Sequence, residues 1–342
     1  MSILFMESFD HYTTEAQAYT KGWLFGVNPP TTSYKRTGIQ SAGLNNAAFV
    51  LSTPVPNGQA IYIHHAVYAG SADSVKLGGT SGNPYDHNQT QVMVYATTDG
   101  QIYAQVHGVG SIGGTAPGVF RFGLWNYVQI KIVVSDTVGE VEVYLNGDLV
   151  LDLSAKDTKY DATTQTTAII LGSRNTHYYD DIVVTTNDGD GINDGYLGEP
   201  RVVCLLPQTD AVAAGSNADF TPSTGTDHGA LVDEATPNDD TDYVSSSTLN
   251  HVDSWEFPAL GYTGDIKGVQ MSLRAKKSDS GTRAIAAVTK PAATNRVHAT
   301  NHYLGMTDYV YWKAIWDQNP EDSAAWEVAD VDGAEFGVKV TV

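Results

Sequence analysis

The sequence predicts an all-β protein made of two antiparallel, jelly-roll-like β-sandwich domains. Apolar and polar residues alternate along most of the chain, which is the pattern of strands with one buried face. Turn-forming Gly, Asn and Asp residues separate these segments, and before residue 186 nothing sustains the apolar period of a helix longer than a single turn. At 342 residues the chain is long enough for two domains with separate cores.

The strand segments of the first half follow one another closely. Residues 59–70 form one strand, and 92–96 is expected to pair with 102–106 across an Asp99-Gly100 turn. Apolar residues then alternate with polar ones over 128–134 and over 141–145. Asn146-Gly147 supplies two residues that tolerate positive φ, so a tight hairpin turn is predicted before the alternation resumes at Leu149. Two more strands are expected at 167–173 and 178–186.

The second half begins with the apolar run 200–207 and a long polar stretch, 208–242. Regular β segments then return, so a second and smaller sandwich is predicted. Its expected strands are 243–247, 254–260, 266–277, 282–290, 309–316 and 334–342. The domains are therefore placed at 1–186 and 199–342, with an Asp/Gly-rich hinge at 187–198.

Composition excludes several classes of protein. The formal net charge of −20 leaves no basic surface to neutralise phosphates, so nucleic acid is not an expected partner. A single cysteine, Cys204, excludes an internal disulfide and cysteine-based zinc sites. No apolar run approaches the roughly 20 residues of a membrane-spanning helix. The N-terminal segment 1–10 lacks the basic start of a signal peptide and is predicted to be a strand, so synthesis in the cytoplasm is expected.

Several segments in combination resemble a family of tailed-bacteriophage virion structural proteins. They are MESFDHY (6–12), GLWNYVQIKIVV (123–134), GEVEVYLNG (139–147), YYDDIVV (178–184), YLGEPRVVCLLP (196–207), DEATPNDDTDYV (233–244) and AEFGVKV (334–340). The resemblance implies a concanavalin A or laminin G-like jelly roll followed by a second β-sandwich. It also implies a non-enzymatic structural protein on the outside of a virion, in a tail or tail fibre or as a capsid decoration.

The partners implied by this resemblance are other virion proteins and further copies of the chain, with a homotrimer favoured. The alternative function is a glycan-binding adhesin that recognises host surface polysaccharide through the segment NTHYYDD (175–181). Tyr178 and Tyr179 would stack on sugar faces there, and Asp181 would accept hydrogen bonds from hydroxyl groups.

The segment TTNDGDGINDGYLGE (185–199) admits two interpretations. Asp188, Asp190 and Asp194, with Gly191 between them, match part of a calcium-loop pattern in which alternate carboxylates converge on one cation. Ile192 stands where an EF-hand loop needs a ligand, and Gly/Asn/Asp clusters are also the usual material of turns. We interpret the segment as the interdomain hinge, with bound calcium as the alternative and no other cofactor expected.

A glycoside hydrolase is the remaining alternative. Jelly rolls that cleave β-glucans carry paired carboxylates on one strand, and the nearest match here is Glu140 with Glu142, where the third acidic position is occupied by Leu145. Asp180 and Asp181 are adjacent on a strand and are therefore expected to face opposite sides. No catalytic residue is assigned, and the protein is expected not to be an enzyme.

Overall fold

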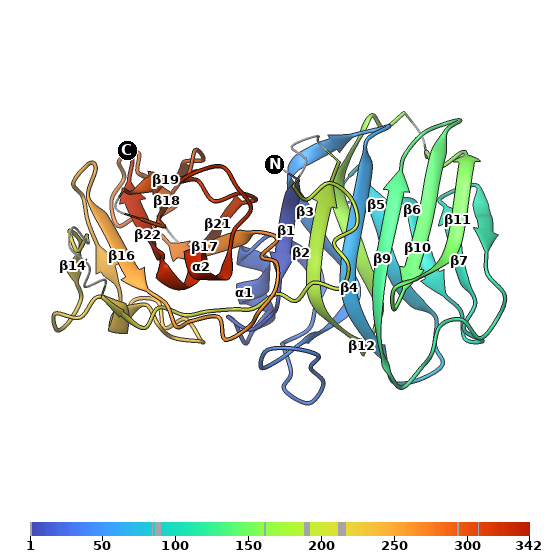
Figure 1. The fold of residues 1–342 in the computed structure, drawn as a ribbon, viewed down its shortest axis with the longest axis horizontal. Coiled ribbons are helices and arrows are strands. Elements are labelled where there is room, and N and C mark those ends of the chain that lie inside the picture. Colours follow the sequence, from blue (N-terminus) through green and yellow to red (C-terminus); the bar gives the residue numbers. More distant parts are fainter. Residues whose placement is uncertain are drawn as a thin grey trace. The chain divides into compact units, whose positions relative to one another are not determined.

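The computed structural model describes residues 2–83, 85, 90–160, 162–187, 192–210, 217–292, 294–306 and 308–342. Strands dominate the described chain and pair antiparallel throughout, which confirms the predicted all-β class (Figure 1). The chain divides into two compact units, Met1–Val203 and Cys204–Val342, which are described separately.

The first unit contains one extended network of strands and a short helix. Its strands are β1 (Ile3–Glu7), β2 (Trp23–Val27), β3 (Ala42–Pro56), β4 (Ala60–Ala69), β5 (Val75–Ser81), β6 (Thr90–Ala96), β7 (Ile102–Val106), β8 (Gly110–Gly114), β9 (Trp125–Val133), β10 (Gly139–Leu145), β11 (Asp148–Lys156) and β12 (Gln165–Thr186). The helix α1 (Glu15–Thr20) begins with a capping box in which Thr14 and Gln17 exchange hydrogen bonds, a signal that the apolar periodicity did not reveal.

Strand β12 joins the two layers of this sandwich. Its first half pairs with β3 and β5, and its second half pairs with β1 and β4. The sequence predicted two strands here, 167–173 and 178–186, but the structure forms one long strand with an irregular register between Ser173 and Tyr178. Gly172 has a φ of +75° near this point, which an L side chain rarely adopts. The strand can therefore bend from one sheet into the other.

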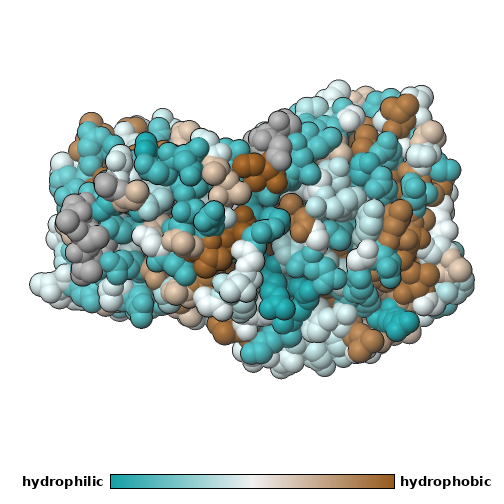
Figure 2. All heavy atoms as spheres, in the orientation of Figure 1, coloured by the Kyte–Doolittle hydropathy of each residue, from teal (hydrophilic) through white to brown (hydrophobic). Residues whose placement is uncertain are grey.

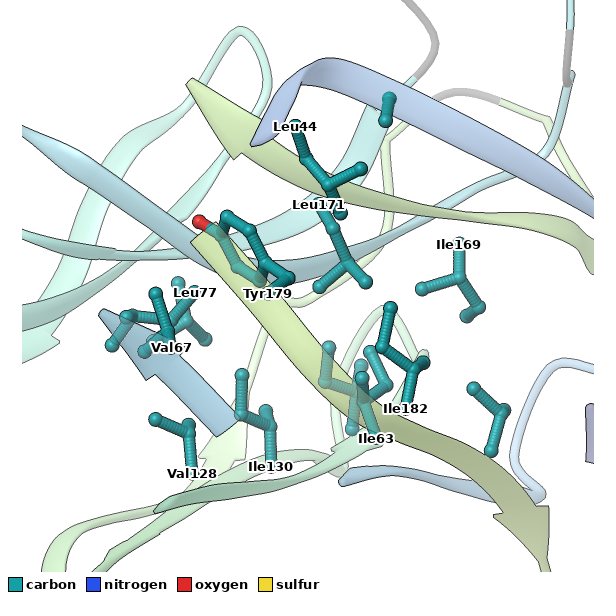
Figure 3. Close-up of a cluster of buried hydrophobic side chains, with 14 of the residues drawn as sticks. Leu44, Ile63, Val67, Leu77, Val128, Ile130, Ile169, Leu171, Tyr179 and Ile182 are labelled. Atoms are coloured by element: carbon teal, nitrogen blue, oxygen red, sulfur yellow. The ribbon is translucent and has the colours of Figure 1, made fainter. Parts of the chain in front are cut away.

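The core lies between the two layers. Inward-facing residues come from alternate positions of each strand, as Val128, Ile130 and Ile132 do on β9. Figure 3 shows Val128 and Ile130 gathered with Ile63, Leu171 and Ile182 in this core. Each fully buried side chain of this size stabilises the fold by about 1.5–3 kcal/mol.

Both predicted hairpins are present in the first unit. Asn146 and Gly147 have φ values of 51° and 91° and connect β10 to β11, as the positive-φ turn requires. Strands β6 and β7 pair in the predicted register, with Val94 opposite Ala104.

The second unit has a six-stranded sheet in the order β13-β16-β22-β18-β19, with β20 pairing to β18. The antiparallel pair of β17 and β21 packs against it through a core that includes Trp255, Leu273, Trp316 and Phe336. The elements of this unit are β13 (Thr209–Asp210), β14 (Thr221–Pro222), the 3-10 helix η2 (Gly229–Leu231), β15 (Val244–Ser245), β16 (Val252–Glu256), β17 (Val269–Ala275), β18 (Ala284–Lys290), β19 (Arg296–Val297), β20 (His302–Tyr303), β21 (Val310–Trp316), α2 (Val328–Gly333) and β22 (Glu335–Val340).

Of the segment predicted as a hinge, the structure describes residue 187 and residues 192–198. Its Tyr196 packs edge-on against Tyr62 and donates a hydrogen bond of 3.1 Å from Oη to Glu142 Oε2. This segment therefore lies on the outer face of β4 and β10. The apolar run 200–207 that follows forms no strand, and the domain boundaries themselves stay a prediction. Among the described residues, no helix has the length and apolar character needed to cross a membrane.

Candidate functional site

Three aromatic residues line up across neighbouring strands on the outer face of the first unit. Tyr178 of β12 is the register partner of Tyr68 on β4, and Tyr68 is the partner of Trp125 on β9. The rings of Tyr68 and Trp125 lie 5.8 Å apart. All three side chains are partly exposed. We call these three residues the aromatic row.

Tyr34 adds a fourth ring from outside the sheet. Its ring stacks on Tyr178 at 4.3 Å with an interplanar angle of 17°, and it lies 5.0 Å from the ring of Tyr68. Tyr34 is 39% exposed, so one side of the stack faces solvent. The four rings together form a continuous aromatic surface with polar hydroxyl and indole groups at its edges.

Tyr34 belongs to a loop, residues 31–41, that two adjacent aspartates hold against the sheet. Asp180 accepts hydrogen bonds from the backbone N–H groups of Arg36 and Thr37, at 2.9 and 3.1 Å. Asp181 accepts one from the Arg36 guanidinium at 2.9 Å and one from Thr37 Oγ1 at 2.6 Å. Both aspartates are fully buried. Residues 31–41 are called the anchored loop below.

The expectation that Asp180 and Asp181 face opposite sides of the strand is wrong. Asp181 has a φ of 53°, and the pairing of β12 with β4 shifts register between Asp180 and Val183. A β-bulge of this kind interrupts the alternation of side chains, so both carboxylates reach the same loop residues. The backbone N–H of Val202 also donates to Asp181 at 2.9 Å, which fixes the segment after the predicted hinge.

A third aspartate holds the other end of the anchored loop. Asp10 Oδ1 accepts from the backbone N–H groups of Ile39 and Gln40, at 2.9 and 3.0 Å. The Gln40 side chain in turn donates to the backbone carbonyls of Phe9 and Tyr12. The loop is therefore fixed at both ends by buried hydrogen bonds, each of which contributes about 0.5–1.5 kcal/mol.

Burial shifts the pKa values of the aspartates that hold the anchored loop. Burial and the neighbouring Asp181 carboxylate raise the pKa of Asp180 from 3.8 to about 7, against the opposing effect of its backbone hydrogen bonds. Burial also raises the pKa of Asp10. Arg36 supplies the positive charge, and its guanidinium lies 4.8 Å from the centre of the Tyr127 ring in a cation–π contact.

A pocket adjoins the Trp125 end of the aromatic row, with a volume of about 460 Å³. Its walls come from the connection before β9 and from the turn between β10 and β11. Figure 2 shows that the hydrophobic side chains in view form separate groups among hydrophilic ones.

The three residues that the sequence suggested for glycan binding lie in different environments in the structure. Tyr178 belongs to the aromatic row. Tyr179 is fully buried in the core, where its hydroxyl donates to the Lys76 carbonyl at 2.7 Å and where Figure 3 shows it among aliphatic side chains. Asp181 is buried beneath Arg36. Tyr179 and Asp181 therefore cannot contact a ligand, because the core and the anchored loop enclose them, and this correction leaves only Tyr178.

Sequence reasoning missed Tyr34, Tyr68 and Trp125 as site residues. Tyr68 and Trp125 begin or end strands that had been recognised, but their alignment depends on the register between β4, β9 and β12. The sequence signal that could have indicated them was a tyrosine or tryptophan near the end of a strand, on the face that the alternation predicts to be exposed.

The calcium candidates are only partly described. Asp188 and Asp190, with Gly191, lie outside the described residues. Asp194 Oδ1 accepts a hydrogen bond from Ser2 Oγ at 2.9 Å. In the part of the chain that the structure describes, no group of three or more His, Cys, Asp or Glu side chains is placed to hold a metal ion.

The hydrolase candidates Glu140 and Glu142 share a cation. Lys131 Nζ lies 2.5 Å from Glu140 Oε2 and 2.8 Å from Glu142 Oε1. Glu142 also accepts from Tyr196. These contacts place the two glutamates on the outer face in an ion-pair network beneath the segment that contains Tyr196.

Comparisons with known proteins complete this description. No protein-family model matches the chain, and no curated protein matches its sequence. The chain is similar to three solved structures, among others, at 9–18% identity. They are an endo-β-1,4-glucuronan lyase from the fungus Trichoderma reesei (12% identity, 48% of this chain and 91% of that chain, TM-score 0.34), the alginate lyase Aly36B (18%, 53% and 95%, 0.33) and the potassium-bound carbohydrate recognition domain of Emp46p (9%, 54% and 97%, 0.35). Similarities at this level carry no argument about what the present chain binds.

Proposed function

We propose that the chain is a non-enzymatic surface protein of a tailed-phage particle whose first unit binds polysaccharide. One observation carries the binding proposal: Tyr178, Tyr68 and Trp125 form a row across three strands, and Tyr34 stacks on its end. Each pyranose ring presents a face of C–H groups that packs on an aromatic ring, while its hydroxyl groups reach polar atoms at the edge.

The rigidity of the surface also supports binding. Rings that are already held in place lose little conformational entropy when a ligand arrives, and such preorganisation increases affinity. Here the sheet register fixes the aromatic row, and buried Asp10, Asp180 and Asp181 fix the anchored loop.

The carboxylates near this surface favour binding over catalysis. Asp180 and Asp181 hold the anchored loop with their oxygens and are fully buried, whereas a glycosidase needs an accessible pair that flanks the scissile bond. Glu140 and Glu142 are both paired with Lys131.

The binding proposal is tested by titrating a panel of bacterial surface polysaccharides into the full chain. Tyr34→Ala and Tyr68→Ala are expected to weaken binding at least tenfold, or about 1.4 kcal/mol. Tyr34→Phe keeps the ring and is expected to bind as wild type does. Tyr262→Ala, which removes a tyrosine that is 49% exposed in the second unit, is the matched control. If no polysaccharide binds, or if the alanine variants bind normally, the proposal fails.

The place on the virion rests on the resemblance of the sequence to tailed-phage structural proteins. Partners would be other virion proteins and further copies of the chain, as a homotrimer in a tail, a tail fibre or a capsid decoration. Image reconstruction of the intact particle would locate the chain, and its absence from the particle would refute this part of the proposal.

A further inference from the structure

The pocket beside Trp125 continues the aromatic row. Trp125 contributes to both, so a polysaccharide lying on the row would come next to the pocket at its Trp125 end. The pocket volume of about 460 Å³ is within the range of roughly 300–1,000 Å³ that is usual for small-ligand sites.

Two asparagines that line the pocket hydrogen-bond to the backbone around it. Asn126 Nδ2 donates to the backbone carbonyls of Arg121 and Leu124, at 2.8 and 3.1 Å. Asn146 Oδ1 accepts from the backbone N–H of Tyr127 at 2.8 Å. The two asparagines therefore fix the connection before β9 and the turn after β10, and the pocket keeps its shape without a ligand.

The charged side chains that line the pocket are one cation and one anion. Arg121 and Asp148 both line the pocket and are exposed, and neither forms an ion pair with any residue in the described ranges. A guanidinium only donates hydrogen bonds and a carboxylate only accepts them. A hydroxyl group does both, so two neighbouring hydroxyls of a sugar can satisfy Arg121 and Asp148 together while the sugar face packs on Trp125.

The charges in and around the pocket favour neutral sugars over acidic ones. Arg121 alone would attract a carboxylate, but Asp148 offsets it within the pocket, and the formal charge of the chain is −20. A polyanionic polysaccharide would meet repulsion at long range as well.

We infer that this pocket binds one neutral hexose unit, through neighbouring hydroxyl groups, within the polysaccharide held on the aromatic row. This inference rests on the proposed function and names the class of sugar that the same surface selects.

The test uses the full chain with dextran and mannan as neutral probes and polygalacturonate as the anionic probe. At least one neutral polysaccharide is expected to bind, and polygalacturonate is expected to bind at least tenfold more weakly at low salt. Arg121→Gln and Asp148→Asn should each weaken the binding of neutral polysaccharides about fivefold to tenfold. Asp148→Asn should also reduce the difference in affinity between the neutral probes and polygalacturonate. Nuclear magnetic resonance provides a local readout, since the bound sugar should shift the side-chain amide signals of Asn126 and Asn146.

The pocket variants and the aromatic-row variant test different parts of the surface. If Tyr68→Ala abolishes binding while both pocket variants bind normally, the polysaccharide surface stands and the pocket assignment is wrong. Equal or tighter binding of polygalacturonate would overturn the choice of a neutral sugar. If neither dextran nor mannan binds, the pocket assignment is rejected, whereas the proposed function is rejected only if the panel of bacterial surface polysaccharides also fails to bind.

Discussion

The ring of Tyr34 lies 4.3 Å from the ring of Tyr178 and almost parallel to it, although one residue belongs to a loop and the other to the long strand β12. This stack makes the anchored loop part of the aromatic surface. Its position depends on Arg36 and Thr37, which the two aspartates after Tyr179 hold in place. Stability of the anchor and binding by the surface should therefore change together.

Arg36→Ala should destabilise the first unit strongly. The change leaves Asp181, which is fully buried, without its cation, and breaking a buried pair in this way costs about 3–5 kcal/mol. Urea unfolding measures the loss. Glu199→Gln removes the exposed partner of the same arginine, 43% exposed, and should cost no more than about 1 kcal/mol. Equal losses in the two variants would contradict the anchor.

Asp180 should make the folded state lose stability as pH rises. Its pKa is raised from 3.8 to about 7, so between these values the folded state binds more protons than the unfolded state. Its contribution is complete below pH 4 and is lost as pH rises through 7. The difference in unfolding free energy between wild type and Asp180→Asn, measured from pH 4 to pH 8, isolates this contribution. A difference that does not vary with pH would refute it.

His64 and His65 should make the folded state lose stability as pH falls, which is opposite to the effect of Asp180. Burial lowers the pKa of His64 to about 4, and burial with the neighbouring His64 lowers that of His65 to about 3. The unfolded chain binds protons below about pH 6.5 while these folded groups stay neutral, so stability falls as pH decreases. The slope should be up to about 1.4 kcal/mol per pH unit for each histidine. Unfolding of His64→Gln and His65→Gln should show a shallower loss between pH 6.5 and 4, and an unchanged slope would contradict the assignment.

Glu7 should be among the most sensitive positions of the core. It is fully buried, lies 3.1 Å from Lys21 Nζ, and accepts further hydrogen bonds from Tyr12 Oη and Trp23 Nε1. Burial alone would raise its pKa, but Lys21 and the other partners outweigh burial and lower it to about 2. Glu7→Gln leaves Lys21 buried without a counter-charge and should cost about 3–5 kcal/mol in urea unfolding.

Two further variants make that result specific. Glu15→Gln changes an exposed acid at the start of α1 and should cost less than about 0.5 kcal/mol. Glu7→Gln combined with Lys21→Met removes both charges and should lose less than Glu7→Gln alone. A double variant that is as unstable as the single one would show that the ion pair is not the cause.

Local patterns predicted the strands well where each residue responds to its immediate neighbours. Alternation identified β9 and β10, and Asn146-Gly147 identified the turn, because pleat and φ are properties of a few adjacent residues. The sequence did not reveal that 167–173 and 178–186 form one strand. That outcome depends on β3, β4 and β5, which pair with it from elsewhere in the chain.

By itself the sequence determined the all-β class, the buried face of most strands and the tight turns. Only the tertiary structure decided the candidate site, since register aligned Tyr178, Tyr68 and Trp125 across three strands and the anchored loop brought Tyr34 to them. It also decided which candidate residues stay accessible. The bulge at Asp181 turned two neighbouring acids toward the loop, because buried carboxylates need hydrogen-bond donors that only a distant segment could supply.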